Sequence, residues 1–162
     1  MIRLKNLLKW KFVLLYLLGG TGYALMEIVW RGYSHWSMFL LGGACFLMAG
    51  LISRLRTNIF VKSLLCGSCI TVAELFCGLV VNRLLGLDVW DYTHLPFDVL
   101  GQICLPFTLL WIALSVAVIP LYSKFDSGLS CAQKILNKPD VIKFKAFAVK
   151  ILEYSGRRAE VE

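Results

Sequence analysis

"IFVKSLLCGSCITVAELFCGLVVNRLL" (residues 59–85) decides the fold of this chain. The stretch is mostly apolar and exceeds the about 20 residues that a helix needs to cross the roughly 30 Å hydrocarbon layer of a membrane. No water is available in that layer, so the backbone N–H and C=O groups must pair within the segment. Residues 59–85 are therefore predicted to form a transmembrane helix, with one acidic residue, Glu74, inside it.

Three further apolar runs of similar length occur along the chain: Phe12–Trp30, His35–Ile52 and Val99–Tyr122. The hydrophobic content of 59% and the mean hydropathy of +0.73 exceed what a soluble domain of 162 residues normally carries. The sequence therefore predicts an all-α polytopic membrane protein with four transmembrane helices.

The net charge of +7 is distributed in a way that predicts topology rather than nucleic-acid binding. Lys and Arg residues precede the first apolar run, surround the loop near residues 54–62, and follow the fourth run. The loop near residues 85–98 instead carries three aspartates. Positive residues concentrate on the cytoplasmic side of membrane proteins. We therefore expect a multi-pass protein of the cell membrane with both termini in the cytoplasm and the first run kept as an anchor.

An internal repeat relates the two halves of the chain. "YSHWSMFLLGGACF" (residues 33–46) aligns without gaps on "YTHLPFDVLGQICL" (residues 92–105). Upstream of each copy, a glycine and a hydroxyl residue precede Glu27 and Glu74 at the same spacing. The alignment predicts two tandem helical hairpins, at about 12–52 and 59–122, related as a parallel repeat; chance similarity between apolar segments is the alternative. Residues 1–122 would then be the transmembrane domain and 123–162 a basic cytoplasmic tail.

The two intramembrane glutamates are the leading candidates for function. Gly67, Thr71, Glu74 and Gly78 fall within about 60° of one another on a helix, so Glu74 is expected to face the bundle. Glu27 lies on a comparable stripe of the first run, with Arg31 one turn later.

A charge in the membrane interior is costly and is normally paired, protonated or in contact with water. Arg31 and Arg83 are the candidate counter-charges for these glutamates, and Asn82 extends the polar stripe. The glutamates either line a substrate path or pocket, or act as hydrogen-bonded structural groups between the helices.

The loop around "DVWDYTHLPFD" (residues 88–98) holds a second group of candidates. Aromatic residues there suit a headgroup belt, and Pro96 with Asp98 is expected to start the fourth helix. A zinc or manganese site or a hydrolytic histidine–aspartate pair is a weaker alternative, because no metal-ligand spacing and no convincing nucleophile is present. The candidates in the outer loops are His35, Trp90, Asp91, Tyr92 and His94.

The six cysteines do not form a disulfide framework in this reading. Cys66 and Cys69 match the redox C-x-x-C spacing. Thiolate chemistry, however, needs an accessible, electropositive setting, whereas this pair lies inside a predicted membrane helix. A structural role is therefore favoured, and no cofactor is expected.

Three segments resemble a known family of short bacterial membrane proteins. They are "EIVWRGYSHWSMFLLGG", "AELFCGLVVNRLLGLDVWDYTHLP" and "GQICLPFTLLW". They look like the family named putative ABC-transporter type IV permeases, and the resemblance covers residues 20–122. Trp90-Asp91-Tyr92 followed by Gly101-Gln102-Ile103-Cys104 is its most specific part. The chain departs from the family at Thr93 and Asp98, where serine and asparagine are usual. The resemblance implies a multi-pass membrane protein of the permease type.

The chain contains no G-x-x-x-x-G-K-[S/T] loop, so any ATPase activity must belong to another polypeptide. We therefore predict a permease-like transporter subunit, not itself an enzyme, that oligomerises or acts with a separate ATPase or other membrane subunit in the lipid bilayer. A membrane scaffold without transport activity is the alternative. The tail segment 140–154 is predicted to form a basic amphipathic helix, which lies on the anionic leaflet, docks a partner or packs beneath the bundle.

Overall fold

A computed structural model describes residues 2–136 and 138, and the regular elements among these residues are helices. The long helices are α1 (Ile2–Arg31), α2 (Trp36–Ser53), α3 (Ile59–Gly78) and α4 (Leu105–Leu136). A π-helical turn, η1 (Leu79–Leu84), extends α3. Four helical stretches are long and apolar enough to cross a membrane, which confirms the predicted all-α, four-helix architecture. The predicted amphipathic segment 140–154 lies outside the described residues.

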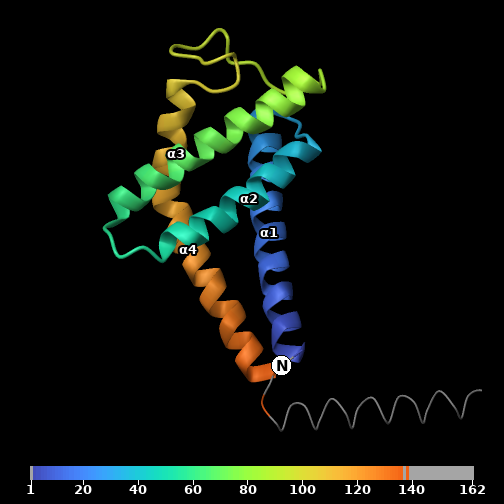
Figure 1. The fold of residues 1–162 in the computed structure, drawn as a ribbon, viewed down its shortest axis with the longest axis vertical. Helices are drawn as coiled ribbons and strands as arrows, with labels where there is room; N and C mark the ends of the chain where they lie inside the picture. The colour runs from blue at the N-terminus through green and yellow to red at the C-terminus, as the bar shows by residue number, and fades with distance from the viewer. Residues whose placement is uncertain (1, 137, 139–162) are drawn as a thin grey trace, which may run out of the picture. The chain divides into compact units, whose positions relative to one another are not determined.

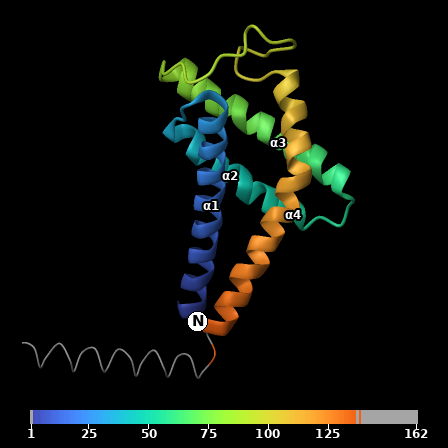
Figure 2. The same cartoon turned by 180° about the vertical axis from the view of Figure 1, so that it is seen from behind.

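The helices of Met1–Asp126, one of two compact units in the chain, are packed in crossing pairs. In two opposite views, α2 and α3 run obliquely across α1 and across the part of α4 in this unit (Figures 1 and 2). The end of α1, the start of α2, the end of η1 and the start of α4 all lie toward the same end of this unit, called here the loop end (Figure 1). The second unit is Ser127–Glu162, in which α4 continues to Leu136, beyond the end predicted at Tyr122.

Polar side chains begin α2 and α3 where the apolar runs begin. The His35 ring nitrogen Nδ1 accepts a hydrogen bond from the Ser37 backbone N–H, and the Asn58 side-chain oxygen Oδ1 accepts one from Val61 N–H at 2.9 Å. These bonds satisfy N–H groups that a helix leaves unpaired in its first turn. At the other end of α1, Gly32 adopts a left-handed φ of +81° and donates to the Ile28 carbonyl. Glycine accepts this conformation without steric cost, so α1 ends there.

Glycines allow the helices to approach closely. A Cβ placed on Gly19 of α1 would lie 3.0 Å from the Gly42 carbonyl oxygen of α2, and one on Gly42 would lie 3.2 Å from the Gly19 carbonyl oxygen. On α3, a Cβ on Gly67 would lie 2.6 Å from the backbone nitrogen of Ile112 in α4. Close approach at small residues is how helices associate in lipid, where van der Waals packing replaces the hydrophobic effect.

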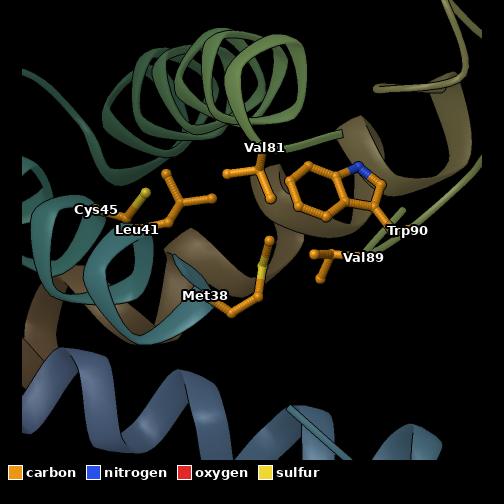
Figure 3. Close-up of a cluster of buried hydrophobic side chains, with 6 residues drawn as sticks. All are labelled: Met38, Leu41, Cys45, Val81, Val89 and Trp90. Carbon is orange, nitrogen blue, oxygen red and sulfur yellow. The ribbon is translucent and has the colours of Figure 1, made fainter. Parts of the chain in front are cut away.

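A buried apolar cluster joins α2, η1 and the loop that follows η1 (Figure 3). Trp90 is 8% exposed and belongs to this cluster, although the sequence placed its ring in an interfacial aromatic belt. Its indole N–H donates to the Gln102 carbonyl. The apolar part of the ring therefore packs in the cluster while its polar group has a hydrogen-bond partner. The cluster consists of Met38, Leu41, Cys45, Val81, Val89 and Trp90.

The fourth helix begins at Leu105, later than the start predicted at Val99 and marked by Pro96 and Asp98. Residues 85–104, called here the long loop, fold into turns instead. Gly101 has a φ of +69°, and its carbonyl accepts a hydrogen bond from Tyr92 N–H at 2.8 Å. The Asp98 carboxylate caps this turn by accepting from Gly101 N–H, so it does not begin a helix.

The long loop gives the second copy of the proposed internal repeat a different conformation from the first. Residues 36–46 of the first copy are helical, whereas the aligned residues of the second copy up to Cys104 lie in the long loop. Gly42 is accordingly helical and its counterpart Gly101 is left-handed. The upstream parts of both copies, which carry the two glutamates, are helical in α1 and α3.

Candidate functional site

Glu74 of α3 is buried at the loop end of the molecule, with 3% of its surface exposed. Its Oε2 accepts a hydrogen bond from the indole N–H of Trp111 in α4 at 2.9 Å. Its Oε1 accepts one from the Tyr92 hydroxyl in the long loop at 3.1 Å. Each oxygen therefore has a neutral donor. Among the described residues, Glu74 forms no ion pair.

Stacked aromatic rings hold both donors in place. The Trp111 ring stacks on Tyr23 of α1, with ring centroids 5.7 Å apart and planes inclined by 28°. The Tyr92 ring stacks on Phe107 of α4 at 4.6 Å and 13°. Burial, together with the neighbouring Glu74, raises the pKa of the Tyr92 hydroxyl, so this group remains a neutral donor at physiological pH. The two aromatic donors of the carboxyl group are thus held by rings from α1 and α4.

Glu27 belongs to a second polar group at the end of α1. Its Oε1 pairs with the Arg31 guanidinium at 2.7 Å, and its Oε2 accepts from the Ser34 hydroxyl at 2.6 Å. Arg31 also donates to the Val89 carbonyl of the long loop and lies 4.7 Å above the Tyr33 ring. The guanidinium therefore links α1 to the long loop while it neutralises Glu27.

One cavity of about 570 Å³ brings these groups together. Glu27, Arg31 and Glu74 contribute to its wall, and most of the remaining lining is aromatic and aliphatic, including Tyr23 and Trp111. This combination of an apolar wall with a few convergent polar groups is typical of small-molecule sites, and the volume lies in their usual range.

Asn82 fixes the long loop beside this cavity. Its amide N–H group donates to the Trp90 carbonyl at 3.0 Å and to the Gln102 side chain at 2.8 Å, and its oxygen accepts from Val89 N–H at 2.8 Å. Asn82 is 8% exposed and lies in the π-helical turn η1. A single buried side chain thus binds both ends of the long loop.

The residues predicted from the sequence divide into two sets. The cavity wall includes five of them, which come from α1, α3 and the long loop: Glu27, Arg31, Glu74, Trp90 and Tyr92. The other predicted residues lie outside this wall.

Arg83 donates to the Leu100 carbonyl at 3.3 Å, and Asn82 holds the long loop. His35 caps α2. Asp91 is exposed and accepts from both Thr93 N–H and the Thr93 hydroxyl, which lower the pKa of its carboxyl. His94 is exposed in the same loop. Within the described residues, no three histidine, cysteine, aspartate or glutamate side chains gather as a metal site would require.

Sequence reasoning missed Trp111 and Phe107 as parts of this site. Trp111 and Phe107 were counted as ordinary members of an apolar run, because periodicity does not show which lipid-buried ring meets a carboxyl group. An available signal was the indole N–H of Trp111, which needs an acceptor when it is buried in a membrane. The carboxyl groups of the apolar runs were the candidates.

The six cysteines of the chain are free. Cys66 is buried and its C-x-x-C partner Cys69 is exposed, so the two thiols lie on different faces of α3. This placement agrees with the structural reading of the motif.

Comparison with known proteins gives one match. The family described as Putative ABC-transporter type IV matches residues 10–154, which is most of the chain and includes every residue of the cavity. No curated protein and no solved structure gives a significant match. The chain therefore belongs to the Putative ABC-transporter type IV family, as a multi-pass membrane protein with four apolar helices.

Proposed function

We propose that this protein is a permease-like subunit that binds a small solute in the Glu74 cavity and acts with a partner. The observation that carries the proposal is the cavity of about 570 Å³, in which a buried carboxyl group lies among aromatic rings. An ionisable side chain inside a membrane helix costs about 2.5–3.5 kcal/mol on insertion scales. A group that is retained at this cost, in the wall of a cavity, is well placed to recognise a ligand.

The partner in this proposal is a separate ATPase, and the chain itself is not an enzyme. The family description supports an ABC-transporter context, and the sequence has no phosphate-binding loop of its own. Four helices are also few for a complete translocation path, so we expect an oligomer or a second membrane subunit to complete it.

The topology in this proposal has both termini in the cytoplasm of a cell membrane. The support is the distribution of charge: Arg54, Arg56 and Lys62 lie around the α2–α3 connection, whereas the long loop carries Asp88, Asp91 and Asp98. Labelling of single cysteines with a membrane-impermeant thiol reagent tests it. The cysteine of His94→Cys should react in intact cells, and that of Arg56→Cys should react only after lysis. The opposite pattern would reverse the topology.

Native mass spectrometry of the protein extracted from its own membranes in mild detergent tests the transporter role. An ATPase bound at fixed stoichiometry is the expected result. A homo-oligomer without any ATPase, under conditions that preserve other transporter complexes, would contradict the proposed coupling to ATP.

A scaffold without transport activity is a second candidate, because a specific observation favours it. The two hydrogen bonds of Glu74 tie α3 to α4 and to the long loop, as a purely structural carboxyl group would do. A variant that combines Glu27→Gln and Glu74→Gln separates the two functions. Intact assembly with loss of solute binding supports the permease-like function, whereas dissociation of the helical bundle supports the scaffold.

A further inference from the structure

A second cavity adjoins the first one between α1 and α4. Its volume is about 450 Å³, and its wall extends to Leu18 on α1 and to Phe125 on α4. Four residues contribute to both walls: Tyr23, Met26, Trp111 and Leu114. The two cavities are therefore neighbouring parts of one groove.

The two parts of this groove differ in polarity. Glu27, Arg31 and Glu74 contribute only to the first cavity. Within the described residues, no side chain of Asp, Glu, Lys, Arg or His lines the second cavity, whose wall is made of apolar residues, glycines, Tyr23 and Ser115. The groove thus has a charged end and an apolar end, and Trp111, which donates to Glu74, lies where they meet.

The length of the groove suits a hydrocarbon chain. Its wall runs along α1 from Leu18 to Arg31, which is about 20 Å at a rise of 1.5 Å per residue. One leaflet of a bilayer has a hydrocarbon depth of about 15 Å, half of the roughly 30 Å layer. A chain of the length found in membrane lipids therefore fits, with its polar head at the charged end.

The charged end favours a cationic head. Arg31 already pairs with Glu27 at 2.7 Å, whereas the donors that Glu74 has among the described residues, Tyr92 and Trp111, are neutral. An anionic head would meet the carboxyl group of Glu74 at this end, and Arg31, the cation in the same cavity wall, already pairs with Glu27.

We propose that the groove binds a single-chain amphiphile with an ammonium head, which lies against Glu74 while its chain fills the second cavity. This inference rests on the proposed function, since it names the class of solute that the Glu74 cavity takes.

Three probes test the inference on the wild-type protein in phosphatidylcholine nanodiscs. Hexadecyltrimethylammonium has both the head and the chain, hexadecanol has the chain alone, and tetramethylammonium has the head alone. Trp30, Trp90 and Trp111 line the first cavity, so tryptophan fluorescence reports binding, with empty nanodiscs as the partition control. Native mass spectrometry gives the stoichiometry. We expect one hexadecyltrimethylammonium per chain, bound at least tenfold more tightly than either of the other two probes.

Two variants test which end of the groove binds the head and which end binds the chain. Glu74→Gln should weaken hexadecyltrimethylammonium binding at least tenfold and leave hexadecanol unchanged. Gly22→Leu should weaken only the probes with a chain, because a Cβ at Gly22 meets no atom within 4 Å and the added side chain enters the second cavity. Gly128→Leu is the matched control, since Gly128 is equally open and does not line either cavity.

Equal affinity for hexadecanol and hexadecyltrimethylammonium would contradict the proposed preference for a cationic head. An unchanged affinity in Glu74→Gln would contradict it as well. Either result would still be consistent with a cavity that binds a ligand. Absence of saturable binding for all three probes would overturn the amphiphile inference. If an ATPase is nevertheless recovered in the extraction experiment, the proposed transporter role stands even though the amphiphile inference fails.

Discussion

Substitution of Gly67 by alanine tests the crossing of α3 and α4 that positions Glu74 beside Trp111. The added Cβ would lie 2.6 Å from the Ile112 backbone nitrogen and 2.7 Å from its Cα. These are backbone atoms of α4, so the clash is relieved only if one helix moves. Overpacking of this kind costs about 1–3 kcal/mol of folding free energy.

A matched control removes the effect of alanine on helix formation. Alanine stabilises a helix interior by about 1 kcal/mol relative to glycine, and Gly22→Ala gains the same amount without a clash, because no atom lies within 4 Å of its Cβ. The difference between the two variants is therefore the overpacking cost. At about 2–4 °C per kcal/mol for a chain of this size, Gly67→Ala should melt about 2–12 °C below Gly22→Ala.

A thiol-reactive dye measures this difference during thermal unfolding in detergent. Cys66 and Cys104 are 0% and 2% exposed, so they react only when the helices separate, whereas Cys69 and Cys131 react at once and set the baseline. If Gly67→Ala melts at the same temperature as Gly22→Ala, α3 and α4 do not approach closely at Gly67, and the overpacking argument is refuted.

Three further predictions concern buried polar groups. Trp111→Phe keeps an aromatic ring but leaves one oxygen of Glu74 without a donor, so the variant should be less stable by about 1–3 kcal/mol in the same thermal assay; an unchanged melting temperature would show that the indole bond contributes nothing. Asn82→Ala removes three hydrogen bonds to the long loop and should accelerate its cleavage in limited proteolysis, while equal protection would refute a fixing role. Lys11 of α1 pairs with Asp126 of α4 at 2.7 Å, so Lys11→Met should lower the melting temperature because it removes this ion pair; an unchanged melting temperature would show that the pair contributes nothing.

The positions of the first three helices follow from the sequence for physical reasons. An apolar run long enough to cross the bilayer has to be helical, and polar residues such as His35 and Asn58 at the edges of the runs supply the caps. Hydropathy measures transfer into lipid and not backbone conformation. Residues 99–104 are mostly apolar and were read as the start of a helix for that reason. The left-handed Gly101 holds them in turns instead, and Pro106 lies in the first turn of α4, where its missing N–H costs no hydrogen bond.

The candidate site was predictable only in part. Glu27 and Glu74 stand out in the sequence because an ionisable group in an apolar run carries a large cost. Their partners do not stand out. Trp111 comes to Glu74 from α4 and Tyr92 comes from a loop whose path depends on Asn82, and such contacts between distant segments leave no periodic pattern in the chain.

The hydrogen bonds of Glu74 connect the groove to the long loop. A cationic head that binds this carboxyl group competes with the Tyr92 hydroxyl for the same oxygen, whereas the Trp111 bond, on the other oxygen, comes from a helix and stays in place. Loss of the Tyr92 bond weakens the attachment of the long loop, to which Asn82, Arg31 and Arg83 still donate hydrogen bonds. Linkage between two such equilibria is reciprocal, so a change that loosens the loop, such as Asn82→Ala, should also change the affinity of the groove for a cation. The ligand-binding role proposed for Glu74 is thus coupled to its structural role through one side chain.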